Sequence, residues 1–170
     1  WGPTLLGEWK GVSIHHAGWM VAAFEISGIV GMLVAGWATD RFFGGRGPRV
    51  CVICMALATV FVALFWGISQ PPMWLATLLL GAAGFCIYGP QALVGIAAAN
   101  IATKKAAATA VGFTGLFGYA STLVSGWGLG LLAQHYGWNI AVGALILIAI
   151  MGTLIFMAAW SAKANGYDND

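Results

Sequence analysis

Residues 85–130 read FCIYGPQALVGIAAANIATKKAAATAVGFTGLFGYASTLVSGWGLG, two glycine-rich apolar segments that meet at a short turn containing two lysines. In water each interior glycine costs a helix about 1 kcal/mol relative to alanine. In a bilayer the backbone must satisfy its own hydrogen bonds, so such segments stay helical, and small residues let neighbouring helices approach closely. The stretch therefore predicts two membrane-spanning helices that pack against others.

Small residues recur at every fourth position of the second segment, which places them in one row on a helix. This row consists of Ala106, Ala110, Thr114, Gly118, Thr122, Gly126 and Gly130. A shorter row of the same kind, Ser27, Gly31 and Ala35, occurs earlier in the chain. We expect both rows to form close helix–helix contacts.

The composition indicates the class of protein. Of the 170 residues, 61% are hydrophobic and only 7% are charged, whereas a soluble domain carries about 25% charged residues. The sequence therefore predicts an all-α integral membrane protein whose surroundings are the lipid bilayer. The net charge of +2 is too small to indicate nucleic acid as a partner.

Five apolar stretches approach or exceed the ~20 residues that cross the hydrocarbon core. The expected spans are about 17–38, 50–69, 73–98, 105–134 and 138–162, which together make residues 17–162 a five-helix transmembrane bundle. Residues 1–16 are expected to be the end of a preceding helix and a periplasmic loop, and residues 163–170 a cytoplasmic tail. The opening Trp1-Gly2-Pro3 is expected to continue a sixth span.

The basic residues orient these spans. Those that follow the first, third and fifth spans are Arg41, Arg46, Arg49, Lys104, Lys105 and Lys163, whereas the opposite side carries only Lys10. Because cytoplasmic loops hold an excess of Lys and Arg, we expect the first group and the C-terminus in the cytoplasm. The protein is then a multi-pass membrane protein.

Glu25 is the one acidic residue deep inside an expected span. A charge at the bilayer centre costs roughly 3 kcal/mol on insertion scales, so a functional role is the default expectation. Glu25 is interpreted as a carboxylate that lines a transport pathway. The alternative is a protonated, hydrogen-bonded side chain that only fastens helices together.

Several linked motifs resemble one family. They are GWATDRFF at 36–43 with GRGP at 45–48, YGPQ at 88–91, KKAA at 104–107 and GFTGLFGY at 112–119. Together they resemble the organophosphate:inorganic phosphate antiporter family of the major facilitator superfamily, which includes hexose-6-phosphate transporters, glycerol-3-phosphate transporters and hexose-phosphate sensors. The resemblance covers essentially the whole chain.

The resemblance implies a twelve-helix protein of two six-helix halves, of which this chain is the C-terminal half. The halves rock to expose a midplane site to each side in turn, and a phosphorylated sugar or polyol is exchanged for inorganic phosphate. The implied partners are organophosphate, phosphate and an N-terminal half absent from this chain, and the implied location is the bacterial inner membrane. No cofactor is implied.

The resemblance also implies which residues line the substrate pathway. Beside Glu25, which it pairs with a basic residue of the other half, these are Tyr88, Gln91, Thr114 and Tyr119. Tyr hydroxyl and Gln amide groups can hydrogen-bond sugar hydroxyls or phosphate oxygens without adding net charge. Their alternative role is hydrogen bonding between helices.

A second constellation is implied at the cytoplasmic ends of the helices. It consists of Asp40, Arg41, Arg46, Lys104 and Lys105, which in the superfamily form a gate held shut by ion pairs when the protein faces outward. The alternative is that these charges serve topology and contact lipid headgroups.

No pattern indicates metal or catalytic chemistry. Cys51 and Cys54 have C-x-x-C spacing but lie in an apolar helix, where small apolar thiols are expected. His15 and His16 have no companion at ligand spacing. No metal site, catalytic residue or enzymatic activity is predicted. Two other functions stay open: a membrane sensor of hexose phosphate that signals to a partner kinase, and a proton-coupled facilitator in which Glu25 carries the proton.

Overall fold

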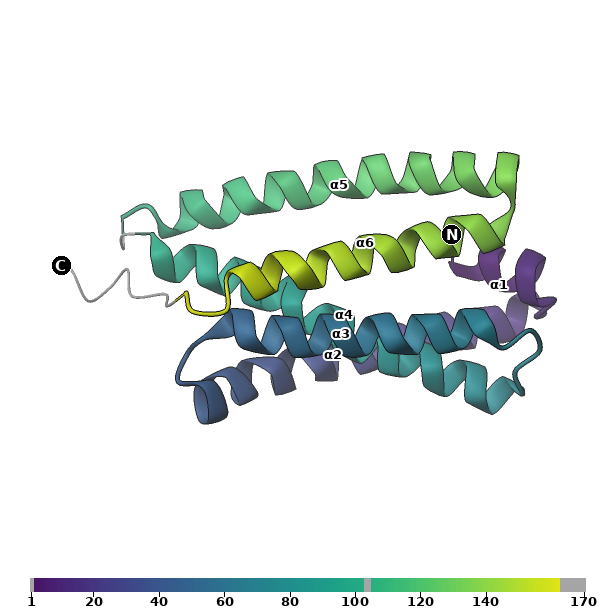
Figure 1. Cartoon of the computed structure of the whole chain (residues 1–170), viewed down its shortest axis with the longest axis horizontal. Coiled ribbons are helices and arrows are strands. Elements are labelled where there is room, and N and C mark those ends of the chain that lie inside the picture. The colour runs from purple at the N-terminus through teal and green to yellow at the C-terminus, as the bar shows by residue number, and fades with distance from the viewer. Residues whose placement is uncertain (1, 103–104, 163–170) are drawn as a thin grey trace.

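The computed structural model describes residues 2–102 and 105–162, apart from the side chain at position 9, and these residues fold into helices joined by short turns (Figure 1). The helices are α1 (Gly2–Lys10), α2 (Ile14–Phe43), α3 (Gly47–Gly67), α4 (Met73–Ile101), α5 (Ala107–Tyr136) and α6 (Trp138–Ala158). Five of them, α2 to α6, are long and apolar enough to cross a bilayer. The predicted all-α membrane fold with five spans is confirmed.

Three of the helices are longer than a bilayer requires. Helices α2 and α5 have 30 residues each and α4 has 29, and a 30-residue helix is about 45 Å long at 1.5 Å per residue. The hydrocarbon core is only about 30 Å thick. The ends of these helices therefore reach into the headgroup region or beyond it, or the helices tilt.

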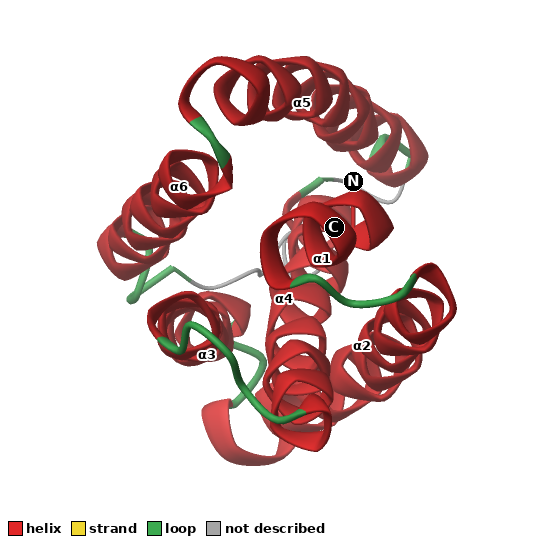
Figure 2. Cartoon of the chain, turned by 90° about the vertical axis from the view of Figure 1, so that its right-hand side faces the viewer, coloured by secondary structure: helices red, strands yellow, loops and turns green. Residues whose placement is uncertain are grey.

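Helix α4 lies at the centre of the bundle, with its most extensive contact to α2 and the next to α3 (Figure 2). Helix α6 packs on α3, and α5 makes smaller contacts with α4 and α6. In the most apolar window of each helix, 39% of the residues of α4 are buried but only 6% of those of α5. Helix α5 is thus the span least covered by the other described helices. Most of its surface is exposed and can contact lipid or another membrane helix.

The turn between α2 and α3 depends on two glycines. Gly44 and Gly45 have positive φ values of 56° and 77°, a region that L residues with a side chain rarely adopt. The Gly45 amide reaches back 3.0 Å to the carbonyl oxygen of Thr39, which also accepts from the Gly44 amide, and together these bonds close the end of α2. This tight end fixes where the charged residues of the turn emerge.

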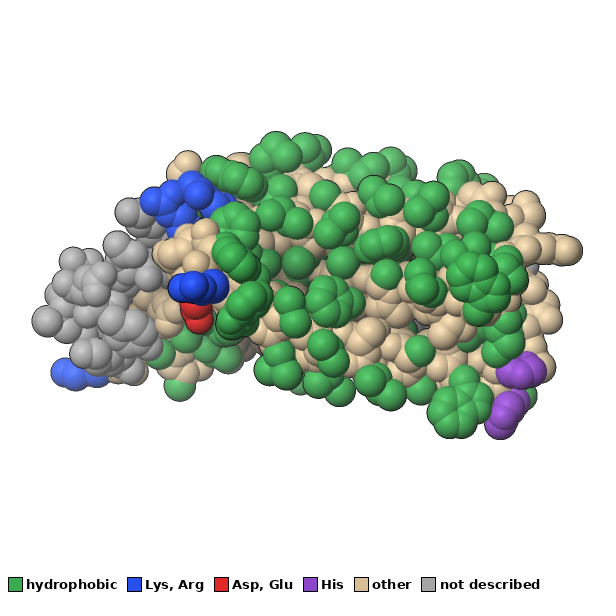
Figure 3. Space-filling model, turned by 90° about the horizontal axis from the view of Figure 1, so that it is seen from below, with side chains coloured by type: hydrophobic (Ala, Val, Ile, Leu, Met, Phe, Trp, Pro, Cys, Tyr) green, Lys and Arg blue, Asp and Glu red, His purple; other side chains and the backbone are tan. Residues whose placement is uncertain are grey.

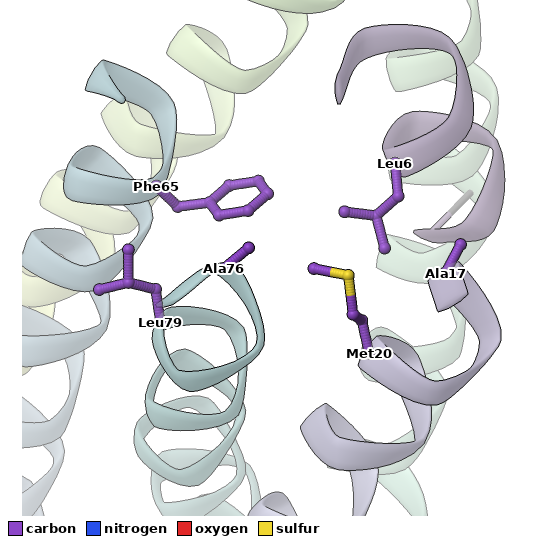
Figure 4. Close-up of a cluster of buried hydrophobic side chains, with 6 residues drawn as sticks. All are labelled: Leu6, Ala17, Met20, Phe65, Ala76 and Leu79. Atoms are coloured by element: carbon purple, nitrogen blue, oxygen red, sulfur yellow. The ribbon is translucent and has the colours of Figure 1, made fainter. Parts of the chain in front are cut away.

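At the opposite end of the bundle, side chains from four helices form a core (Figure 4). Its members are Leu6, Ala17, Met20, Phe65, Ala76 and Leu79. The Lys10 amine donates to the carbonyl oxygen of Ile68 at 2.6 Å and lies 5.2 Å from the centroid of the Phe65 ring. Burial lowers the pKa of Lys10. These contacts hold the short helix α1 against the ends of α2, α3 and α4.

The surface of the bundle matches a membrane setting. Figure 3 shows apolar side chains spread over the length of the molecule, with Lys and Arg at one end and His at the other. Large side chains such as Leu123 and Trp127 are 76% and 73% exposed. A soluble protein rarely exposes so much contiguous apolar surface, so lipid or other membrane helices cover it.

Candidate functional site

Glu25 and Tyr88, both predicted to line the substrate pathway, are in direct contact. The Tyr88 hydroxyl of α4 donates a hydrogen bond to the Glu25 carboxylate of α2. Glu25 is exposed on the surface of the bundle, and Tyr88 is half-buried. The two residues are 63 positions apart in sequence, so their pairing depends on how α2 packs against α4.

That packing is set by interlocking rows of small residues. The row Ser27, Gly31 and Ala35 of α2 lies along Gly81, Phe85 and Gly89 of α4. The Ser27 hydroxyl lies 2.7 Å from the carbonyl oxygen of Gly81, within hydrogen-bonding distance. A Cβ added to Gly89 would lie 2.9 Å from the Cβ of Ala35. The close contact that the sequence predicted for this row is confirmed.

The other three predicted pathway residues line a groove. It has a volume of about 660 Å³ and lies among α3, α4, α5 and α6, with Gln91, Thr114 and Tyr119 on its walls. Tyr88 and Gln91 are three residues apart on α4, a spacing that places two side chains as neighbours on a helix surface. The structure thus brings the five residues into two adjoining sets, one at the α2–α4 contact and one in the groove.

The wall that α5 contributes is polar but internally satisfied. Thr114 donates to the carbonyl oxygen of Val111 at 2.9 Å, Ser121 to that of Gly118 at 2.7 Å, and Thr122 to that of Gly118 at 3.0 Å. Each hydroxyl oxygen keeps lone pairs that can accept a further bond. The groove therefore offers acceptors that suit the hydroxyl groups of a sugar or polyol.

The long row of small residues on α5 is not in close contact with another described helix at its midpoint. A Cβ added to Gly118, a member of this row, would meet nothing within 4 Å, and the same holds for Gly115 beside the row member Thr114; both glycines line the groove. At Gly118, therefore, the close helix contact expected along this row stays a prediction. No described helix packs against the row at this position.

The predicted gate residues gather at one end of the bundle. Arg41 is in the last turn of α2, Arg46 precedes α3, and Lys105 lies in the turn before α5. Asp40 is exposed and lines a pocket of about 140 Å³ that is also lined by Asn100 of α4. Lys104 lies outside the described residues. The ion pairs of a gate stay a prediction.

One basic residue at this end has a role that the sequence did not indicate. The Arg49 guanidinium lies 5.3 Å from the centroid of the Trp160 ring, and its Nε donates to the Trp160 carbonyl oxygen at 3.4 Å. In the sequence, Arg49 stood out only as one of several basic residues after the first expected span. Arg49 joins the start of α3 to the turn after α6.

The cysteine and histidine pairs behave as local features. Cys51 is buried and Cys54 half-buried in α3. His15 accepts from the Trp19 indole at 3.2 Å, and His16 shares a hydrogen bond with Ser13 at 2.8 Å. Within residues 2–102 and 105–162, no three His, Cys, Asp or Glu side chains come together as a metal site would require.

Three similar proteins carry names that bear on function. The chain is 37% identical to the "Probable hexose phosphate transport protein" of Chlamydia pneumoniae over 95% of its own length. It is 34% identical to the "Glycerol-3-phosphate transporter" of Haemophilus influenzae and 32% identical to the "Membrane sensor protein UhpC" of Salmonella typhimurium, each over 96% of its length. These matches span 36%, 38% and 37% of the respective relatives, so the chain covers about a third of their length.

The fold and the family comparison agree. The spanning helices bring the polar side chains of Glu25 and Tyr88 together and place others on the walls of a groove. Residues 2–166 match the profile of the Major Facilitator Superfamily, almost the entire chain. The chain is therefore a multi-pass membrane protein that belongs to the major facilitator superfamily.

Proposed function

We propose that the chain is the C-terminal half of a secondary transporter that exchanges a phosphorylated sugar or polyol for inorganic phosphate by alternating access. The observation that carries the proposal is a carboxylate held within a membrane span by a tyrosine, beside a polar-walled groove. Ionisable residues inside spans mark substrate or ion pathways by default. The names of the relatives direct the choice of substrate toward hexose phosphate or glycerol 3-phosphate.

In this function Glu25, Tyr88, Gln91, Thr114 and Tyr119 border the substrate pathway. The Tyr88 hydroxyl is bonded to Glu25. The remaining polar groups of the five residues are one carboxylate, one amide and two hydroxyl groups, which suit the neutral hydroxyl part of the substrate better than its phosphoryl group. A phosphoryl dianion requires basic side chains. We assign these basic side chains to the N-terminal half of the transporter, with which this chain would pack.

The charged end of the bundle is the cytoplasmic gate in this proposal. Asp40, Arg41, Arg46, Lys104 and Lys105 form it together with the opposite half, and the concentration of basic residues there agrees with a cytoplasmic side. The C-terminus then lies in the cytoplasm, and the bacterial inner membrane is the location. In this proposal the substrate crosses the membrane chemically unchanged.

A second candidate function follows from one of the relatives. The sensor from Salmonella typhimurium is similar over 96% of the chain, as is the glycerol-3-phosphate transporter from Haemophilus influenzae, so similarity alone does not separate transport from sensing. A sensor would bind hexose phosphate with the same pathway residues and pass the signal to a partner kinase. It would not need to move substrate across the membrane.

The experiment that separates the two uses the full-length protein containing this chain, reconstituted in vesicles loaded with labelled phosphate. Glucose 6-phosphate or glycerol 3-phosphate is added outside without a pH gradient. Efflux of label stimulated by one of them supports the antiporter and identifies its substrate class. Tight binding of the same compound without efflux contradicts transport and supports the sensor.

A further inference from the structure

The Tyr88 side chain has little freedom of direction. Gly28 lies directly against the ring, so that a Cβ at this position would come within 2.6 Å of the ring atom Cδ2. The Phe24 ring meets the Tyr88 ring edge-on, with centroids 6.0 Å apart and planes at 74°. Phe24 and Gly28 are one turn apart on α2, so the tyrosine ring packs against the surface of α2 between these two residues.

The backbones of α2 and α4 beside this packing site are also in close contact. A Cβ at Gly84, one turn before Tyr88 on α4, would lie 2.4 Å from the carbonyl oxygen of Phe24. The two backbones therefore touch without side chains between them. The relative position of Phe24, Gly28 and Tyr88 cannot change unless α2 and α4 separate, because contacts this close leave no space for sliding.

From this geometry we infer that Tyr88 is a positioning residue for Glu25, and that its hydroxyl serves the carboxylate rather than the substrate. The bond occupies the carboxylate atom Oε2 and leaves Oε1 for a donor from the substrate or from the opposite half. Tyr88 thus holds the Glu25 carboxylate in one direction, a role that differs from the expectation that Tyr88 itself binds substrate.

This inference rests on the proposed function for its meaning in transport, but the positioning can be measured without transport. A hydrophobic carbodiimide reacts with carboxyl groups in membrane spans, and mass spectrometry can quantify the adduct on the peptide containing Glu25. In the full-length protein we expect Tyr88→Phe to raise the rate of labelling about ten-fold, because the carboxyl group loses the tyrosine hydroxyl that holds it and a hydrogen bond to such a group is worth roughly that factor. Tyr136→Phe, an exposed tyrosine at the end of α5, should label at the wild-type rate.

Two results would overturn the inference. One is wild-type labelling of Glu25 in Tyr88→Phe, which would mean that the hydroxyl has no effect on the carboxylate even if thermal stability falls. The other comes from exchange kinetics in vesicles: the double variant Tyr88→Phe with Glu25→Gln should be no slower than Glu25→Gln alone. A double variant at least ten-fold slower would show that Tyr88 acts on the substrate directly.

The two proposals fail in different ways. If the wild-type protein does not exchange phosphate but Tyr88→Phe accelerates labelling as expected, the positioning role stands and the transport function fails. If exchange is observed and labelling is insensitive to Tyr88, the transport function stands and the positioning role fails. Glu25→Gln, which cannot form the adduct at this position, establishes that the signal comes from Glu25.

Discussion

Gly31 of α2 lies against the backbone of Phe85 in α4, so close that a Cβ built on Gly31 would be 2.0 Å from the Phe85 carbonyl oxygen. A backbone atom cannot rotate away as a side chain can. This contact therefore sets the distance between the two helices that carry Glu25 and Tyr88, and any side chain at position 31 must push them apart.

Gly31→Ala should destabilise the protein for this reason. Overpacking of a close contact costs roughly 1–3 kcal/mol, and here it also moves Tyr88 away from Glu25. Thermal unfolding in detergent should show a lower midpoint. The matched control is Gly36→Ala on the same helix, where an added Cβ meets nothing within 4 Å. Equal stability of the two variants would contradict the close contact.

Leu6→Ala tests the core that attaches α1. The Leu6 side chain is only 2% exposed among residues of four helices, and truncation of such a residue costs about 2–5 kcal/mol. We expect chemical denaturation of the solubilised protein to begin at lower denaturant concentration. Ile14→Ala is the control, because Ile14 is 84% exposed and should change stability little. Similar effects of the two substitutions would show that α1 is not anchored by this cluster.

The fold was predictable because a bilayer leaves few choices. Five apolar stretches of spanning length can only be helices in lipid, and the row of small residues Ser27, Gly31 and Ala35 already indicated a close contact. The partner of that row was not predictable. Small residues show where a helix can approach but not which helix does so, and the similar row on α5 is open at Gly118.

The candidate site shows the same limit. Glu25 and Tyr88 stood out separately as polar groups in apolar spans, yet nothing in the sequence joined residues 63 positions apart. Their pairing follows from the register of α2 on α4, which Gly31 and Gly84 fix through backbone contacts and Gly28 through its contact with the Tyr88 ring. The role of Arg49 was missed because its partner Trp160 is 111 positions away and offers a carbonyl oxygen, which any residue has.

Replacement of Arg49 should loosen the turn after α6. The planar guanidinium stacks on Trp160 and donates to its carbonyl oxygen, whereas a lysine offers a point charge without the plane. A cation–π contact at an exposed site is worth ~0.5–1 kcal/mol. With a cysteine introduced at Ser161, Arg49→Lys should raise the rate of maleimide labelling by about two- to five-fold, and Arg49→Ala by at least as much. Unchanged rates would show that the contact does not hold the turn.

Asp40→Asn tests the proposed cytoplasmic gate. Asp40 is exposed at the end of α2 and lines a pocket with Ala97 of α4, so a charge partner on the opposite half can reach it when the cytoplasmic side closes. Loss of the charge removes that ion pair, and the full-length protein should shift toward inward-facing forms. A cysteine at Ala97 should then react faster with a cytoplasmic maleimide, by about five-fold if the pair contributes ~1 kcal/mol. Asp40→Glu, which keeps the charge, should react at close to the wild-type rate. Equal labelling in Asp40→Asn and Asp40→Glu would assign the charges at this end to membrane topology instead of gating.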